Sequence, residues 1–224
     1  MRLQMENIMA REHRYTVKEI FRTLQGEGAM TGRTAVFLRF SGCNLWTGRE
    51  EDRAHSVCTF CDTDFIGTDG ERGGKYTAQE LAQVVEDAWL EGMAADRHRY
   101  IVITGGEPTL QLDKALIDAL HARDFEIAIE TNGTNPVPEG VDWICVSPKS
   151  SAPVVQTHGH ELKLVYPQAE AMPEKFETMA FQHFFLQPMD SDAQMDNTEA
   201  AIAYCRSHPQ WRLSLQTHKM TGIP

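Results

Sequence analysis

Along most of the sequence, short apolar segments typical of buried strands alternate with longer amphipathic segments typical of helices, and this alternation constrains the fold more than any other feature. The predicted strands cover 34–40, 100–108, 125–133, 141–149, 161–167, 183–190 and 211–218. The predicted helices cover 77–92, 112–124 and about 197–207. The first helix opens with Thr77 and Glu80 at the spacing of a capping box. This order of elements predicts an α/β fold whose parallel strands are linked by right-handed crossovers.

The number of strands limits the architecture to an open sheet. About six parallel strands are too few to close an eight-stranded barrel, so we expect an open partial (β/α) barrel. In folds of this kind the ligand site lies at the carboxyl ends of the strands. Those ends carry the motifs "TGGEP", "ETNG", "SPK" and "QPMD", and a cysteine-containing loop follows the strand at 34–40. We therefore expect these segments to meet at one edge of the sheet.

A length of 224 residues fits a single domain. The first fourteen residues are polar and lack periodicity, so we expect a flexible extension at 1–14 and one domain at 15–224. The formal net charge of −11 repels phosphate backbones and disfavours a nucleic-acid partner. The N-terminal segment lacks the apolar core of a secretory signal, and no apolar run reaches the length of a membrane span. We expect a soluble cytoplasmic protein.

Three cysteines lie close together in the stretch "SGCNLWTGREEDRAHSVCTFCDTD" at 41–64. Cys58 and Cys61 form a C-x-x-C pair, and fourteen residues separate Cys43 from Cys58. The odd total of five cysteines argues against a disulfide framework and for metal ligation in a reducing compartment. Thiolates are soft ligands that suit zinc or an iron–sulfur cluster. Structural zinc needs a fourth ligand, which His55 could supply, whereas a four-iron cluster with three thiolates keeps one iron open.

These motifs together carry a family resemblance. The cysteine stretch followed by "TGGEP" resembles the radical S-adenosylmethionine (SAM) enzymes, whose usual cysteine spacing is C-x3-C-x2-C rather than the C-x14-C-x2-C found here. The segments "FRTLQGEG", "CDTDF", "ETNGT", "VSPK", "QPMD" and "QTHKMTGIP" resemble more closely the 7-carboxy-7-deazaguanine synthase family. The resemblance runs from about Tyr15 to Pro224, which is nearly the whole chain. It implies a reduced radical SAM core, in keeping with a partial barrel.

The expanded cysteine spacing is compatible with a shared site. Enlarging the loop from three to fourteen residues adds about 1.4 kcal/mol of closure entropy, whereas cysteine-rich metal sites contribute roughly 10 kcal/mol or more. The segment "REEDRAHSV" contains good helix formers, and we expect a short helix there that returns the chain to Cys58. The remaining cysteines, Cys145 in a predicted strand and Cys205 in a predicted helix, are expected in the core.

For the cofactors, the resemblance implies that Cys43, Cys58 and Cys61 bind a [4Fe–4S] cluster whose open iron chelates SAM. An electron from the cluster then cleaves SAM to a 5′-deoxyadenosyl radical. The residues implied in SAM binding are Gly105, Gly106, Ser147, Pro148, Lys149, Gln187, Pro188, Met189 and Asp190. Glycines suit a close backbone approach to a ligand, and the side chains of Ser147 and Asp190 can hydrogen-bond ribose hydroxyls.

The implied substrate is 6-carboxy-5,6,7,8-tetrahydropterin. The residues implied in binding it are Leu24, Gln25, Gly26, Glu27, Arg39, Thr104, His218 and Pro224. The carboxylate of Glu27 can accept paired N–H groups of a pterin ring, and the planar fork of Arg39 can pair with the substrate carboxylate. The resemblance also implies that the hydroxyl of Thr63 ligates Mg2+, an ion that needs few protein ligands. Glu107, Glu130 and Asn132 are candidates of second rank.

The implied activity is conversion of this pterin to 7-carboxy-7-deazaguanine, a lyase reaction that releases ammonia and serves deazapurine pathways such as queuosine biosynthesis. The resemblance further implies a homodimer and an external reductant such as flavodoxin. Two alternatives stay open. One is a different radical SAM enzyme, such as an activase that generates a glycyl radical. The other is a zinc-stabilised binding module that uses His55 as its fourth ligand.

Overall fold

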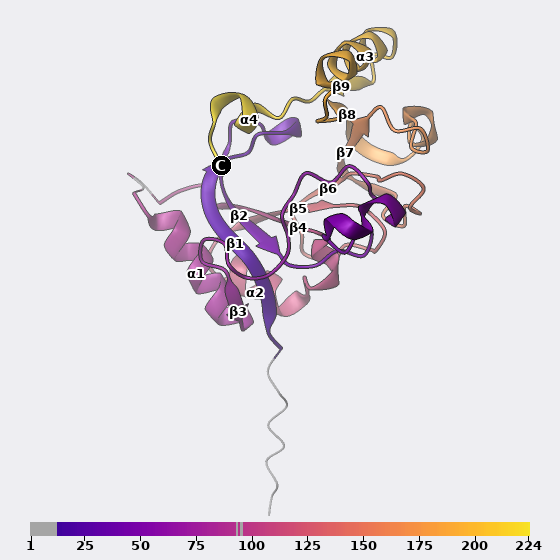
Figure 1. Cartoon of the computed structure of the whole chain (residues 1–224). Coiled ribbons are helices and arrows are strands. Elements are labelled where there is room, and N and C mark those ends of the chain that lie inside the picture. Colours follow the sequence, from indigo (N-terminus) through magenta and orange to yellow (C-terminus); the bar gives the residue numbers. More distant parts are fainter. Residues whose placement is uncertain (1–12, 93, 95) are drawn as a thin grey trace, which may run out of the picture.

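One mixed sheet organises the fold. The computed structural model describes residues 13–92, 94 and 96–224, and within them nine strands form a single sheet in the order β3-β1-β2-β4-β5-β6-β7-β8-β9 (Figure 1). The strands are β1 (Tyr15–Leu24), β2 (Thr34–Phe40), β3 (Gly74–Tyr76), β4 (Tyr100–Gly105), β5 (Glu126–Thr131), β6 (Trp143–Val146), β7 (His158–Tyr166), β8 (Ala180–Pro188) and β9 (Trp211–Leu213). All neighbours from β2 to β9 are parallel, whereas β1 and β3 add an antiparallel edge. The predicted α/β class and open parallel sheet are confirmed.

Helices cover one face of the sheet. They are α1 (Ala78–Leu90), α2 (Lys114–His121) and α3 (Gln194–Ser207), whereas the short α4 (Thr217–Thr221) lies beside the segment that follows β1. Helices α1 and α2 contact each other and pack against β1, β2 and β5, while α3 packs on β8 and β9 (Figure 1). The predicted capping box begins α1, because the Thr77 hydroxyl accepts the N–H of Glu80 and the Glu80 carboxylate accepts the N–H of Thr77.

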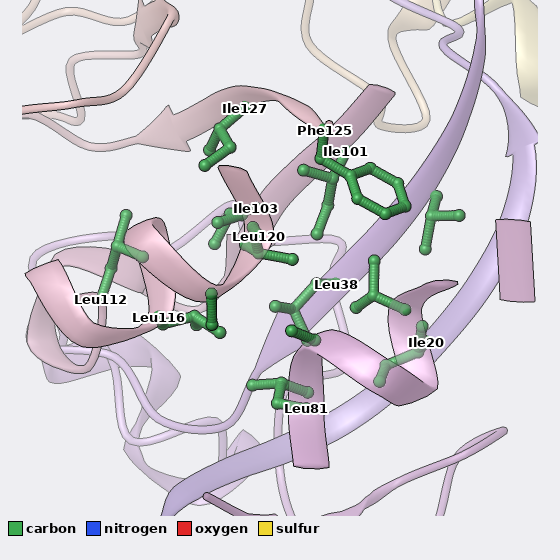
Figure 2. Packing of buried hydrophobic residues seen from close by; sticks show 14 of the residues in the cluster. Ile20, Leu38, Leu81, Ile101, Ile103, Leu112, Leu116, Leu120, Phe125 and Ile127 are labelled. Carbon is green, nitrogen blue, oxygen red and sulfur yellow. The ribbon is translucent and has the colours of Figure 1, made fainter. Parts of the chain in front are cut away.

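The main core lies between α1, α2 and the sheet. Ile101 and Ile103 of β4 belong there to one buried cluster with Leu81 of α1 and with Leu116 and Leu120 of α2 (Figure 2). Complete burial of each such side chain contributes about 1.5–3 kcal/mol, so this layer supplies much of the folding free energy. A second core cluster joins β7, β8 and β9 to α3 and includes Leu162, Leu164, Leu186, Ala201 and Trp211.

The opposite, inner face of the sheet becomes polar toward the carboxyl ends of the strands. In β4, the residues that alternate with the buried isoleucines are Tyr100, Val102 and Thr104. The first two are buried, and the third reaches a cavity. The same alternation leads from buried Ala128 to the cavity-lining Glu130 in β5. The inner face of the sheet is thus apolar along these strands and polar at their carboxyl ends, where a parallel sheet places its ligand site.

Most predicted elements are present with shifted ends, since each predicted strand and helix overlaps an observed one. The prediction for 211–218 is wrong beyond Leu213. Ser214 still donates its N–H to β8, but Thr217 donates both its N–H and its hydroxyl to the Gly26 carbonyl and begins α4. These bonds turn the chain away from the sheet and toward the end of β1.

Two strands are not evident in the sequence. The pairing of β1 with β2 shifts between Val17 and Glu19, and this bulge breaks the alternation by which a strand is recognised. The other, β3, has only three residues. The sequence predicts no helix between β5 and β7, and irregular loops at 132–142 and 147–157 join β5 to β6 and β6 to β7.

The predicted flexible extension at 1–14 lies, apart from His13 and Arg14, outside the described residues. β1 begins at Tyr15, the first residue of the predicted domain. In the described part of the chain, every helix is too short or too polar to cross a membrane.

The capping box gives a test of the fold. We expect Thr77→Ala to lower the free energy of unfolding by about 1 kcal/mol, because the start of α1 loses an acceptor for its free N–H groups. Thr77→Ser keeps the hydroxyl and is the matched control. Urea unfolding followed by circular dichroism measures both, and equal stability of the Ala variant and the parent would contradict a contribution from the cap.

Candidate active site

A cavity of about 190 Å3 opens at the carboxyl ends of the parallel strands, and we call it the cysteine cavity. Its lining includes many of the predicted cofactor-binding residues: Cys58, Cys61, Thr63, Gly105, Gly106, Ser147, Lys149, Gln187, Pro188, Met189 and Asp190. Cys43 lies next to Gly106 of this lining, and Pro148 stands between the lining residues Ser147 and Lys149 in the sequence. The motifs at the strand ends and the cysteine loop therefore meet at one edge of the sheet, as the sequence predicts.

A second cavity, of about 320 Å3, lies next to the first, and we call it the C-terminal cavity. It is lined by all the residues that the sequence resemblance implies for substrate binding: Leu24, Gln25, Gly26, Glu27, Arg39, Thr104, His218 and Pro224. The residues shared by both cavities are Glu27, Asp62, Thr63, Thr104, Glu130 and Gln216. The two cavities are thus adjoining parts of one site, which the C-terminal end of the chain reaches beside β1 (Figure 1).

The glycines of "TGGEP" bring the cysteine loop to this site. Gly105 has a φ of +148°, and a Cβ there would collide with the backbone of Phe40. A Cβ on Gly106 would collide with the Gly42 carbonyl oxygen and lie 2.6 Å from the Cβ of Cys43. The close approach predicted for these glycines is therefore made by the protein's own chain, and it places Cys43 at the edge of the cysteine cavity.

The three thiols suit a cluster better than a single ion. Burial raises the pKa of the Cys58 and Cys61 thiols, and the nearby Lys149 ammonium opposes this rise. Among residues 13–92, 94 and 96–224, no three His, Cys, Asp or Glu side chains converge on one metal position. His55 is exposed at the end of a 3-10 helix. Mononuclear zinc needs ligands around one point, whereas a cluster spreads its thiolates over separate irons.

A buried lysine joins the two cavities and was not singled out by the sequence prediction. Nζ of Lys163 lies 2.7 Å from Glu27 Oε2 and 2.9 Å from Glu130 Oε2, and its side chain is 5% exposed. Burial alone would raise the pKa of Glu27, but Lys163 and the amide of Gln216 outweigh it, so the pKa is lowered. Burial likewise opposes the charge of Lys163, yet the carboxylates raise its pKa. Lys163 and Glu27 are therefore both charged at neutral pH.

A second lysine, Lys219 of α4, ties the C-terminal segment to the cysteine cavity. Its Nζ lies 2.6 Å from Asp62 Oδ2 and 2.6 Å from Asp190 Oδ2. Asp62 directly follows the C-x-x-C pair, and Asp190 ends the "QPMD" motif. α4 also holds His218 against Gly26, where a Cβ would collide with the imidazole ring. The C-terminal segment is thus an ordered wall of the site.

Two further side chains hold the site walls in place. Glu107 is buried, and it accepts the Thr131 hydroxyl at 2.7 Å and the N–H of Asn132 at 2.8 Å. These bonds fix the end of β4 to the end of β5. The guanidinium of Arg39 is held by Glu19, with Nε donating to Oε1 at 2.7 Å. This contact sets the orientation of Arg39 at the C-terminal cavity.

Residues 53–207 match the family model of the radical SAM superfamily. Together with the open parallel sheet and three thiols at its carboxyl edge, this match defines the chain as a radical SAM enzyme. The matched region begins inside the loop that separates the first two cysteines, which is where the spacing departs from the usual one.

Comparison with individual proteins narrows the assignment. The chain is 65% identical to the 7-carboxy-7-deazaguanine synthase of Caulobacter vibrioides over 211 residues, which cover 94% of this chain and 99% of the relative. It is 64% identical, with the same coverage, to the synthase of Bordetella pertussis. Its fold is similar to the crystal structure of QueE from Escherichia coli, with a TM-score of 0.70, 29% identity and coverage of 91% of this chain and 94% of that chain. The chain belongs to the 7-carboxy-7-deazaguanine synthase family, and the resemblance found in the sequence is confirmed.

The Lys163 ion pairs predict a pH-dependent loss of stability. We expect Lys163→Met to lower the free energy of unfolding by about 3 kcal/mol at pH 7.5, because it leaves two carboxylates without their buried partner. In the parent, the lowered pKa of Glu27 contributes stability above the pKa of the unfolded chain and ceases to do so as the pH falls. In the variant, Lys163 no longer offsets burial, so this pKa is higher than in the parent. The difference between the two proteins should therefore shrink as the pH is lowered to 4.5.

Urea unfolding of the protein without cofactors, at both pH values, measures this difference. Lys114→Met is the control, because the Lys114 side chain is 81% exposed and pairs with Asp118 on the surface of α2. Its effect should stay within about 0.5 kcal/mol. A Lys163→Met defect that is equally large at both pH values would contradict the assigned charges.

Proposed function

We propose that this enzyme converts 6-carboxy-5,6,7,8-tetrahydropterin to 7-carboxy-7-deazaguanine with release of ammonia. The ring contraction is redox-neutral overall, since the product and ammonia together contain all the atoms of the substrate. The observation that carries the proposal is the pair of adjoining cavities, one lined by thiols and the other by Glu27 and Arg39. Relatives that are 65% and 64% identical bear the name of this synthase, which supports the same product here.

The residues of the cysteine cavity fit a [4Fe–4S] cluster and SAM. Cys43, Cys58 and Cys61 would hold the cluster, and the segments at 105–106, 147–149 and 187–190 would hold SAM. When bound, the cluster and SAM supply a radical able to remove a hydrogen atom from the substrate. The chain's own contribution is to keep water away from this edge of the sheet and to fix the orientation of the bound groups.

The C-terminal cavity offers complementary groups to a carboxylated pterin. Each oxygen of Glu27 has one protein partner, Lys163 or Gln216, and an ionised carboxylate has roughly four acceptor positions in all. It can therefore also accept N–H groups of a pterin ring. The guanidinium of Arg39 can pair with the substrate carboxylate, while His218 and Pro224 close the cavity from the C-terminal side.

Mg2+ is proposed to bind at Thr63, which lines both cavities. This ion commonly keeps several waters and takes few protein ligands, so one hydroxyl together with substrate oxygens is a sufficient set. Asp62 lies next to Thr63 and is held by Lys219. Its carboxylate can accept a hydrogen bond from a water of the ion's hydration shell.

We further propose that the enzyme acts as a homodimer in the cytoplasm. Radical SAM enzymes require a reductant, and we propose an external electron carrier such as flavodoxin for this role. Both proposals rest on membership of the family.

The alternative functions receive less support. A glycyl-radical activase acts on a protein segment, whereas a cavity of about 320 Å3 is near the lower end for small-molecule sites. A zinc-stabilised binding module would need His55 as a ligand, and this side chain is exposed. The adjoining cavities favour a small, polar substrate close to the thiols.

Anaerobic reconstitution tests the reaction directly. We expect protein loaded with iron and sulfide to convert the pterin, in the presence of SAM, Mg2+ and dithionite, to a product with the mass of 7-carboxy-7-deazaguanine. A Cys58→Ala variant lacks one proposed cluster ligand and should form no product. Failure of the parent protein to form product despite full cluster content would overturn the substrate assignment and leave membership of the superfamily intact.

The last residue of the sequence provides a separate test of substrate binding. The carbonyl oxygen of Pro224 accepts the hydroxyl of Thr23 at 2.9 Å, and Pro224 lines the C-terminal cavity. Removing Pro224 should raise KM for the pterin about tenfold, equivalent to ~1.4 kcal/mol, and leave the cluster content unchanged. Met220→Ala, at a 74% exposed position of α4, is the control. Steady-state kinetics identical to those of the parent would refute a role for this residue.

A further inference from the structure

The loop between the first two cysteines, residues 44–57, is ordered by packing against the segment that follows the C-x-x-C pair. Trp46 is 8% exposed, and its indole ring lies edge-on to the Phe65 ring, with centroids 5.6 Å apart. The indole Nε1 donates to the Arg49 carbonyl oxygen at 3.1 Å. The segment Glu50–His55 forms a 3-10 helix, which agrees with the short helix predicted there. The expanded spacing therefore corresponds to a structured unit.

Arg53 connects this unit to the C-x-x-C pair. Its Nη1 donates to the carbonyl oxygen of Thr59 at 3.0 Å and to that of Cys61 at 3.1 Å. Its guanidinium carbon lies 4.0 Å from the centroid of the Trp46 ring, and Glu50 accepts from its Nε at 2.8 Å. The Arg53 side chain is 27% exposed. A single guanidinium is thus fixed from three sides and directed at the backbone that carries two proposed cluster ligands.

Backbone bonds close the base of the same unit at Leu45. Its carbonyl oxygen accepts the N–H of Val57 at 3.1 Å and that of Cys58 at 3.4 Å. Its own N–H points to the sulfur of Cys43 at 3.4 Å. Residues 44–57 therefore contact all three proposed ligand positions, Cys43 and Cys58 through Leu45 and Cys61 through Arg53.

We infer that Arg53 is a positioning residue for the iron–sulfur cluster. It fixes two carbonyl groups of the C-x-x-C segment and thereby the directions of its thiols. Its permanent positive charge also stabilises the reduced, more negative form of the cluster and raises the reduction potential. Groups that hydrogen-bond to metal-binding segments and orient the ligands commonly have a large effect on how tightly the metal is held. The inference rests on the proposed cluster site and is independent of the identity of the substrate.

Two properties of the reconstituted protein test this role: the rate at which an iron chelator removes the cluster, and the midpoint potential in a redox titration followed by electron paramagnetic resonance. In Arg53→Ala we expect cluster loss to be about tenfold faster than in the parent, within the range for partners of this kind. The midpoint potential should move to more negative values, because a positive charge has been removed. A role confined to loop stability would leave the potential of the bound cluster unchanged.

Arg53→Lys separates charge from geometry. An ammonium keeps the positive charge but lacks the planar fork, so the potential should return toward that of the parent while cluster loss stays faster. Arg49→Ala is the matched control, since Arg49 lies in the same loop with a 71% exposed side chain and should match the parent in both measurements.

The inference is overturned if Arg53→Ala equals Arg49→Ala in either the rate of cluster loss or the midpoint potential. If Arg53→Ala takes up no cluster, Arg53→Lys decides: cluster loss faster than in the parent supports the inference, and an equal rate overturns it. A parent protein that binds no cluster would overturn the cluster site itself and this inference with it, which distinguishes that failure from failure of the Arg53 role alone.

Discussion

Nζ of Lys163 lies between the carboxylates of Glu27 and Glu130, and the geometry of the whole site depends on this contact. An ammonium inside a protein costs several kcal/mol of desolvation unless carboxylates surround it. The two partners come from the segment after β1 and from β5, and Lys163 itself lies in β7. The need to surround the ammonium therefore fixes these three segments relative to one another. The Glu27 carboxylate, kept charged by Lys163, can still accept hydrogen bonds from donors of a bound molecule.

Close backbone contact provides the second constraint. Only glycine at 105 and 106 lets β4 approach Phe40 and Cys43, and buried Glu107 then fixes β4 to β5. The cysteine loop is therefore attached to the same strand ends that line the cysteine cavity. Lys219 of α4 pairs with both Asp62 and Asp190 and thereby attaches the C-terminal segment to the same site. Residues far apart in the sequence form one site because each wall is attached to a different strand end of one sheet.

The sequence predicts the parts of this arrangement that depend on local patterns. The apolar run before "TGGEP" identifies β4 and the edge at which the cavities open. The segment "ELKLV" also contains a usable signal, because charged residues that alternate with leucines in a buried strand require partners inside the fold. That signal identifies Lys163 but not its partners, which lie far away in the sequence. The contacts of Lys219 depend on where α4 begins, and the Thr217 bonds to Gly26 that set this are equally non-local.

The expanded cysteine spacing shows how a long loop between thiols can be ordered. For a flexible chain, the longer loop would add about 1.4 kcal/mol of closure entropy. Here the packing of Trp46 on Phe65 and the two N–H groups accepted by the Leu45 carbonyl oxygen order the loop. The conformational entropy of the loop is then lost when the protein folds. Binding of a cluster by the three thiols would therefore have to order less of the chain. A three-residue spacing is too short for such packing and must take its order from the surrounding barrel. Residues 44–57 are therefore better understood as part of the structure that positions the three thiols than as an interruption between them.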